Sequence, residues 1–439
     1  MVRRAIDSDS LQPSTTIRRS GITRIGWPNL DISFPIPDPA PDTRNRTTGP
    51  GTVLVSGANT RWSNTGGFVV GGYSDGSLVV EDGAVIDTAR FEILGNYNDF
   101  SNSAQFTGAG ARLESEGSLS VGRRGILNFE HGATFPAGLL SIFGRTSLSG
   151  PNVAGTIDGL STAVHVFAGG ELNIEGGADL TTVSTRNTIG SGDDDPPLAL
   201  VRLSGDGTLW DAGLSNIHVA INAFGEDRGN GELLVGDGAI VRANQRLIGT
   251  GGMVSANRGI LEADVFVLGG QLLPGQSPGL LTIDGDLSAD IDSTVEIEIA
   301  GITSVDNYDV VDVTGNVDVK GRILLKFING FTPTAGEQYE FLTAQGTIDL
   351  ADAEYEVQGL QPGFEFEIMP TANGMQVLAL NDGVSSVPEP SSLALFGWMF
   401  IIATQHSSPD ISSDSSRGGL SHFVARHVRL ATAGVLVTR

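Results

Sequence analysis

The chain has 439 residues, of which 60 are glycine, 18% are charged and none is cysteine. The lack of cysteine excludes disulfides, thiolate metal ligands and cysteine nucleophiles, and the 40% apolar share argues against global disorder. The net charge of −25 argues against nucleic-acid binding, because an acidic surface repels phosphate backbones.

Residues 1–50 predict a flexible leader. They carry seven Arg and five Asp, place four prolines within positions 35–41, and show no sustained periodicity. Arg3 and Arg4 would suit the basic start of a secretory signal, but Asp7 and Asp9 interrupt the apolar run that such a signal needs. Either the protein is not secreted or its native start lies elsewhere, and we favour the second interpretation.

Residues 51–290 contain a repeat of the form Gly-x-Leu-x-(Val/Ile/Phe)-x-x-Gly-Ala, which occurs four times. Alternating apolar residues between glycines predict a short strand that ends in a tight turn. One such strand cannot bury its own apolar face, so the copies predict a stack with a shared interior. The predicted interior residues are Leu78, Val80, Leu127, Phe129, Leu172, Ile174, Leu233 and Val235.

Two further patterns precede each copy. A glycine is followed five residues later by a large apolar residue, and then comes a strand with a valine at its centre. One unit of about 45–60 residues therefore holds too many strands for a single coil, and about twelve coils of roughly 20 residues are expected. The pairs are Gly57/Trp62, Gly108/Leu113, Gly159/Val164 and Gly205/Trp210, and the valines are Val70, Val121, Val166 and Val219.

The pattern changes in residues 291–383, where longer strands alternate cleanly. They form either a C-terminal β module that caps the open end or wider coils of the same solenoid. The predicted fold is thus all-β: a right-handed parallel β-helix over 51–290, followed by a smaller β module and flanked by disordered termini, including a tail over 404–439.

The order of these motifs resembles the repeats shared by bacterial autotransporter passengers and PEP-CTERM proteins. Trp62 and Trp210 match that pattern, as do the segment 274–287, which resembles the stretch that closes such repeat regions, and the segment 308–315, which resembles the module after it. The resemblance implies an exported β-solenoid at the cell surface or in the extracellular matrix.

A second resemblance lies in residues 384–403. Val387, Pro388, Glu389 and Pro390 are similar to the PEP-CTERM sorting tag, which in that family is recognised by an exosortase at the inner membrane of Gram-negative bacteria. The apolar run 393–403 that follows has eleven residues, fewer than the roughly 20 needed to span a bilayer. The resemblance to the sorting tag implies exosortase-type machinery as a partner. Extracellular polysaccharide is the second expected partner.

An enzyme is the main alternative, since polysaccharide lyases and hydrolases also occur on β-helices. Such a site needs converging carboxylates beside a basic residue or a metal. The candidates are the run Asp193–Asp195, the surroundings of Asp211, and Asp309 with Asp312. The Asp193–Asp195 run is more typical of a solvated loop than of a catalytic site. Asp309 and Asp312 are expected on opposite faces of one strand.

Other residues favour structural roles. The six histidines show no spacing typical of metal ligands and are expected in turns or on the surface; they are His131, His165, His218, His406, His422 and His427. Trp62 and Trp210 could stack on sugars, but their matched repeat positions favour packing. We therefore expect a non-enzymatic structural or adhesive protein with no cofactor and no metal.

Overall fold

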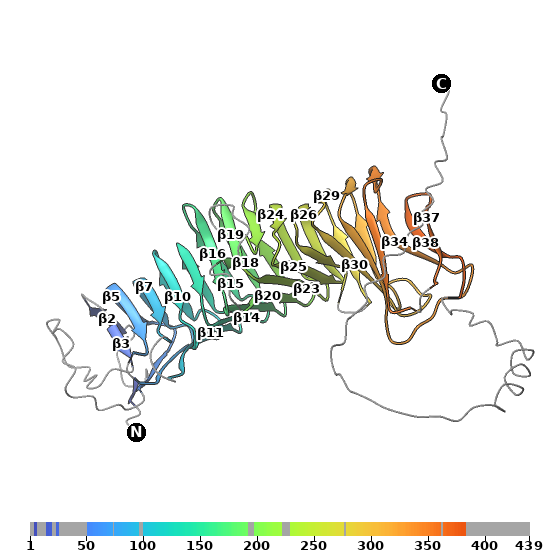
Figure 1. Cartoon of the computed structure of the whole chain (residues 1–439). Coiled ribbons are helices and arrows are strands. Elements are labelled where there is room, and N and C mark those ends of the chain that lie inside the picture. Colours follow the sequence, from blue (N-terminus) through green and yellow to red (C-terminus); the bar gives the residue numbers. More distant parts are fainter. Residues whose placement is uncertain are drawn as a thin grey trace, which may run out of the picture.

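The computed structural model describes residues 4–6, 15–19, 23–25 and 51–382, except 73, 96–99, 192–196, 222–228, 276–277 and 361–362. All regular elements in these residues are strands. The chain winds in successive coils that stack into an elongated rod (Figure 1). The prediction of an all-β solenoid is confirmed.

Each coil passes through one strand of sheet A and then through two columns of sheet B. All pairings of sheet A are parallel. Its strands are β1 (Arg4–Ile6), β4 (Gly51–Ser56), β6 (Gly76–Glu81), β8 (Asn102–Thr107), β11 (Gly125–Glu130), β14 (Arg145–Ser149), β17 (Glu171–Glu175), β20 (Ala199–Ser204), β23 (Gly231–Gly236), β25 (Gly252–Asn257), β27 (Gln271–Leu273), β30 (Thr294–Ile299), β33 (Arg322–Phe327) and β36 (Glu354–Gln358).

Sheet B joins its two columns through four long strands that run along both: β5 (Thr60–Val70), β7 (Val85–Ile93), β24 (Ile240–Ile248) and β26 (Gly259–Val267). The first column adds β2 (Thr15–Arg19), β9 (Arg112–Ser115), β12 (Thr134–Ala137), β15 (Ala154–Asp158), β18 (Asp179–Val183), β21 (Leu209–Asp211), β28 (Leu280–Ile283), β31 (Val310–Val313) and β34 (Gln338–Ala344). The second adds β3 (Thr23–Ile25), β10 (Ser118–Val121), β13 (Leu139–Ile142), β16 (Thr162–Phe167), β19 (Arg186–Ser191), β22 (Asn216–Val219), β29 (Leu287–Ala289), β32 (Val317–Val319) and β35 (Ile348–Asp349).

The four repeat copies supply every second strand of the middle of sheet A. Leu78 pairs with Ala104, which in turn pairs with Leu127, and the same alternation continues to Leu172 and Leu233. One repeat therefore spans two coils, and a strand without the motif separates successive copies. All eight predicted interior side chains lie inside the rod and are at most 2% exposed.

Burial of these ladders is what holds the coils together. Each inward Leu, Val, Ile or Phe gives about 1.5–3 kcal/mol when it leaves water, offset by the entropy of ordering the backbone. Near the N-terminal end the interior is aromatic, where Phe106 stacks on Phe129 at 4.9 Å and Phe129 on Phe135 at 4.2 Å between ring centroids. The four predicted valines, Val70, Val121, Val166 and Val219, lie in one ladder of the second column.

The number of coils is smaller than expected. Ten strands of sheet A, β4 to β27, fall within residues 51–290, against the twelve predicted, since a coil takes about 24 residues rather than 20. One predicted pair is also misplaced: Trp62, Leu113 and Trp210 lie in the first column, whereas Val164 lies in the second. The turn that matches Gly57 in that coil is formed by Gly150, whose φ is +97°.

The coils continue past residue 291. β30 and β33 extend sheet A, and β31 and β34 extend sheet B, so residues 294–358 form wider coils of the same solenoid. The architecture changes only at the end, where β37 (Phe366–Pro370) and β38 (Gly374–Ala379) pair antiparallel with each other and β38 with β34. Only this small antiparallel unit departs from the solenoid, so the predicted boundary of the β module at residue 291 lies too early.

Three strands occur inside the predicted leader. β1 pairs parallel with β4, and β2 and β3 pair with β5, so they start both sheets. Strands of three to five residues are too short to give a periodic signal in the sequence. The predicted sorting segment 384–403 and tail 404–439 lie outside the described residues.

Candidate functional site

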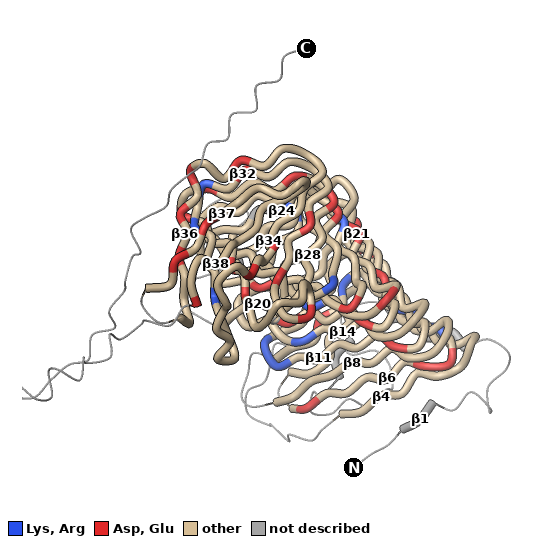
Figure 2. The backbone as a smooth tube through the Cα atoms, turned by 90° about the vertical axis from the view of Figure 1, so that its right-hand side faces the viewer, with Lys and Arg blue, Asp and Glu red and all other residues tan. Residues whose placement is uncertain are grey.

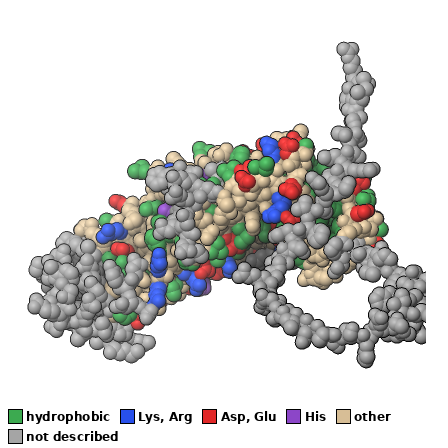
Figure 3. Space-filling model, viewed as in Figure 1, with side chains coloured by type: hydrophobic (Ala, Val, Ile, Leu, Met, Phe, Trp, Pro, Cys, Tyr) green, Lys and Arg blue, Asp and Glu red, His purple; other side chains and the backbone are tan. Residues whose placement is uncertain are grey.

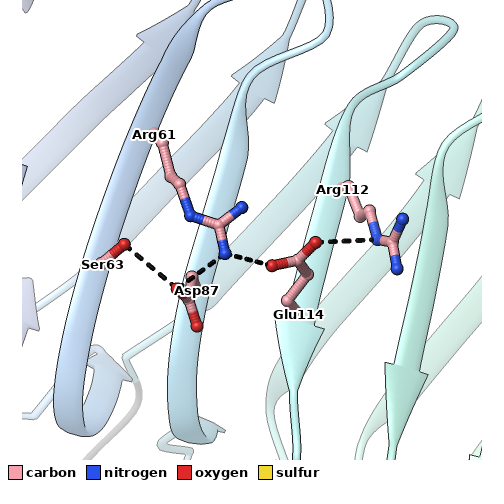
Figure 4. A network of polar contacts seen from close by, with 5 residues as sticks. All are labelled: Arg61, Ser63, Asp87, Arg112 and Glu114. Carbon is pink, nitrogen blue, oxygen red and sulfur yellow. Dashed lines mark hydrogen bonds and ion pairs between the residues drawn. The ribbon is translucent and has the colours of Figure 1, made fainter. Parts of the chain in front are cut away.

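The outer face of the first column of sheet B carries the best-defined polar network. Arg61 contacts Asp87 at 2.7 Å and also contacts Glu114, and Arg112 lies 3.3 Å from the second oxygen of Glu114 (Figure 4). Ser63 donates a hydrogen bond to Asp87 at 3.1 Å. We call these five residues the Arg61 network, and it ties together β5, β7 and β9.

Each carboxylate of the Arg61 network is thus matched by a guanidinium. Hydrogen bonds from Arg61 to Glu114 and Asp87 raise the pKa of Arg61. The side chains of Arg61 and Asp87 are 40% and 39% exposed, so the pairs are screened by solvent. The arrangement suits cross-coil ion pairing.

Asp211, an expected candidate, has a similar environment farther along the same column. Arg242 lies 3.1 Å from Asp211 and 2.6 Å from Glu262, and so links three successive coils. Asp211 also accepts a hydrogen bond from the backbone N–H of Gly213 at 2.9 Å. Acidic and basic side chains alternate along the rod in this way, and Figure 3 shows both kinds interspersed on one flank.

Asp309 and Asp312 are separated as predicted. Asp312 points outward and accepts a hydrogen bond from the Thr343 hydroxyl at 2.5 Å. Asp309 is only 1% exposed, and its two oxygens accept backbone N–H groups of Gly279 at 2.6 Å and Glu298 at 2.8 Å. Burial raises the pKa of Asp309 to about 7, and the two hydrogen bonds oppose that rise. Through these two hydrogen bonds Asp309 links neighbouring coils.

The other candidates do not assemble a site. The Asp193–Asp195 run lies outside the described residues, as do His406, His422 and His427. His131 occupies an exposed turn, whereas His165 stacks on Phe167 at 3.6 Å and burial lowers its pKa to about 4. His218 is 7% exposed, so the expectation of a surface or turn position is wrong for it, because it packs on the covered outer side of β22.

Both tryptophans are packing residues, as expected. Trp62 is 2% exposed and Trp210 is fully buried, which leaves no ring face for a sugar. Trp210 donates from Nε1 to the Thr182 hydroxyl at 3.4 Å inside the rod. In the described part of the chain no group of three or more His, Cys, Asp or Glu is arranged to hold a metal.

Two features escaped the sequence analysis. Arg246 is fully buried inside the rod, where Nη2 contacts the Val241 carbonyl while Nε and Nη1 have no hydrogen-bond partner among the described residues. The corner between the columns of sheet B carries a side-chain ladder, in which Asp264 accepts from the Asp286 backbone and Asp286 from the Asn316 backbone. The similar triplets Asp284-Gly285-Asp286 and Thr314-Gly315-Asn316, one coil apart, were the available signal for that ladder.

No protein-family model matches this chain, and no curated protein matches it. Among the described residues, no helix is both long enough and apolar enough to cross a membrane.

Proposed function

We propose that the chain is a non-enzymatic, exported structural or adhesive protein. Its rod would display repeated loops at the cell surface or in the extracellular matrix. The observation that carries the proposal is the continuous, largely apolar interior, which runs from β4 to β33 with inward residues such as Val55, Phe129 and Leu325 at most 1% exposed. A rod of this kind fixes the spacing of its surface loops, because each coil is held by its two neighbours.

The surface chemistry supports the same role. On the first column of sheet B, charged side chains form ion pairs between coils, as in the Arg61 network and around Arg242. Such pairs set the register of neighbouring coils and leave a flank of alternating charge. An extracellular polysaccharide would contact that flank through the displayed loops.

Export and sorting rest on the sequence resemblance alone. Val387–Pro390 resembles the PEP-CTERM tag, so the proposed partner is an exosortase-type enzyme. The test is to express the chain with its native upstream region in a Gram-negative host that has an exosortase, and to compare it with a Glu389→Ala variant. We expect the parent chain at the cell surface and the variant retained; equal surface signal for both would overturn the sorting proposal.

A carbohydrate-active enzyme remains the second candidate, and the Arg61 network is the observation that favours it. Asp87 and Glu114 face solvent beside two guanidinium groups, which is the composition of a polysaccharide-cleaving site. Release of reducing ends from acidic polysaccharides decides between the two functions. Turnover that disappears in Asp87→Asn and Glu114→Gln variants would establish the enzyme, whereas binding without turnover supports display.

A further inference from the structure

The C-terminal end of the rod has an incomplete interior. Tyr355 and Val357 of β36 continue the inward rows of Ile323 and Leu325, yet they are half-buried, whereas Ile323 is 2% and Leu325 0% exposed. Phe366 and Ile368 of β37 are half-buried at the same end. This end therefore exposes apolar surface that every earlier coil covers with the next one.

The backbone at this end is also incomplete. Among the described residues β36 pairs with β33 alone, and β37 pairs with β38 alone. The Glu354 N–H binds the Gly321 carbonyl on the β33 side, and alternate residues of a strand face opposite neighbours, so the N–H groups of Tyr355 and Val357 face the open side. An unpaired edge of this kind is a template for another strand.

The two ends of the rod differ in charge. Residues 346–382 contain seven acidic residues and no basic residue, and acidic positions lie around β36 and β37 in Figure 2. By contrast, β1, β2 and β3 contain four arginines and no acid: Arg4, Arg18, Arg19 and Arg24. Opposite charges favour contact between the two ends, and like charges disfavour pairing of the acidic end with itself.

We propose that copies of this chain associate head to tail, with the open edge of β36 in one copy docking on β1 of the next. Only this orientation continues the parallel ladders, because all strands of sheet A run in one direction. A two-fold dimer would set β36 antiparallel to its copy and bring the acidic ends together. A head-to-tail contact does not close, so it produces open filaments. The inference adds a mode of assembly to the proposed structural role and does not depend on export.

The first test is sedimentation velocity of the full chain over a wide concentration range at low and high salt. We expect the weight-average mass to rise past that of a dimer with concentration, and to fall as salt screens the charged ends. A mass that remains that of the monomer at low salt would overturn the proposal. A mass that stops at the dimer would overturn it as well and indicate two-fold pairing.

The second test blocks the edge itself. Val357→Pro removes an N–H that faces the open side, and proline is tolerated on an edge strand at such a position. We expect at least a tenfold weaker association, which corresponds to about 1.4 kcal/mol. Val357→Ile, which keeps the N–H and the apolar side chain, is the matched control and should associate like the parent. Equal association of the proline variant would count against docking at β36.

The third test reverses the end charges. Glu354→Lys with Glu365→Lys makes the C-terminal end less acidic, and Arg18→Glu with Arg24→Glu makes the N-terminal end less basic. Each variant alone should associate more weakly, and a mixture should recover pairs in which the altered ends meet. Glu116→Lys with Glu175→Lys makes the same charge change on exposed positions of the flank and should have no effect. No recovery on mixing would contradict the complementarity of the ends.

The tests separate this inference from the proposed function. Filament formation is measured on purified protein, without cells or polysaccharide. Loss of assembly in Val357→Pro with unchanged surface sorting would therefore leave the export proposal intact, and failure of sorting with intact assembly would do the reverse.

Discussion

At the scale of single residues, Arg246 is the clearest conflict between a side chain and its surroundings. Its guanidinium lies inside the rod, beside Ile217 and Val265 in the ladder, and two of its donor groups have no partner among the residues that the structure describes. Burial lowers the pKa of Arg246 to about 9, yet the group stays charged at neutral pH. A buried charge without a counter-ion costs several kcal/mol.

We expect Arg246→Met to stabilise the protein by about 1–3 kcal/mol, because an apolar chain of similar length removes the desolvation cost. The free energy of unfolding in urea measures this. Arg242→Met, on the same strand but in the exposed ion pairs with Asp211 and Glu262, is the control and should change stability by less than about 1 kcal/mol. A strong loss of stability in Arg246→Met would show that the buried guanidinium has an unseen partner.

Asp309 predicts a pH dependence. Its pKa in the folded state is about 7, above the ordinary value of about 3.8, so its contribution to stability is fully present below pH 4. That contribution is lost as the pH rises toward and through 7, because the folded protein must then give up a proton that the unfolded chain has already lost.

Asp309→Asn should remove this dependence of stability on pH. The amide can accept only one of the two N–H groups of Gly279 and Glu298, so we expect a constant loss of about 1–2 kcal/mol. As the pH rises from 5 to 8, however, the free energy of unfolding of the variant should increase by about 2–4 kcal/mol relative to that of the parent. The charged groups that act on Asp309, Glu298 and Glu296, are both paired with Lys326 and are the same in the two proteins. Unfolding curves at the two pH values test this, and an equal difference at both would refute it.

At the scale of elements, the turn after each repeat strand explains the invariant Gly-Ala pair. The residue before the glycine and the glycine itself both have positive φ, as at His131 (+55°) and Gly132 (+85°). The N–H of Ala133 then binds the Glu130 carbonyl at 3.2 Å and closes the turn. The alanine is fully buried at the corner, where a larger side chain would push the coils apart.

This geometry predicts opposite effects at adjacent positions. Gly132→Ala should destabilise by about 1–2 kcal/mol, because alanine tolerates positive φ poorly; space is not the cause, since the nearest atom to an added Cβ is the Ala109 Cα at 3.6 Å. His131→Gly should be neutral or stabilising by about 0.5–1 kcal/mol. The midpoints of thermal unfolding of the two variants test this. Equal changes of the midpoint in both would contradict the positive φ angles assigned to this turn.

The sequence predicted the strands that carry the glycine motif and missed those between them. β8 and β20 also place two apolar residues inward, for example Ala104 and Phe106, and β14 places Thr146 and Leu148 inward, but none of the three carries the Gly-x-Leu repeat pattern. The buried position of Arg246 was equally hidden. Strict alternation from Val241 would place residue 246 outside, but the register shifts between Arg242 and Gln245, where the strand turns from one column to the next. Such shifts follow from coil closure and have no local sequence signal.

At the scale of the whole molecule, stability is distributed along one dimension. The strands of each coil pair only with those of the coils before and after it, so a central coil has two paired interfaces and the last one has a single interface. The ladder residues of the central strands are at most 2% exposed, whereas Tyr355 and Val357 in β36 are half-buried. The ends should therefore open more readily than the middle.

Hydrogen exchange of the backbone amides tests this gradient. We expect the slowest exchange in the strands from β14 to β20 and progressively faster exchange toward β36 and β37, because local opening needs only one interface to break at an end. Val357→Pro should speed exchange in β36 and β33 but leave β14 unchanged, whereas Leu172→Ala in the centre, at a cost of about 2–5 kcal/mol, should speed exchange over several coils on both sides. Exchange in monomeric conditions keeps assembly out of the comparison. Uniform protection along the rod, or one all-or-none response to both substitutions, would show that the solenoid opens as a single unit and that the nearest-neighbour description fails.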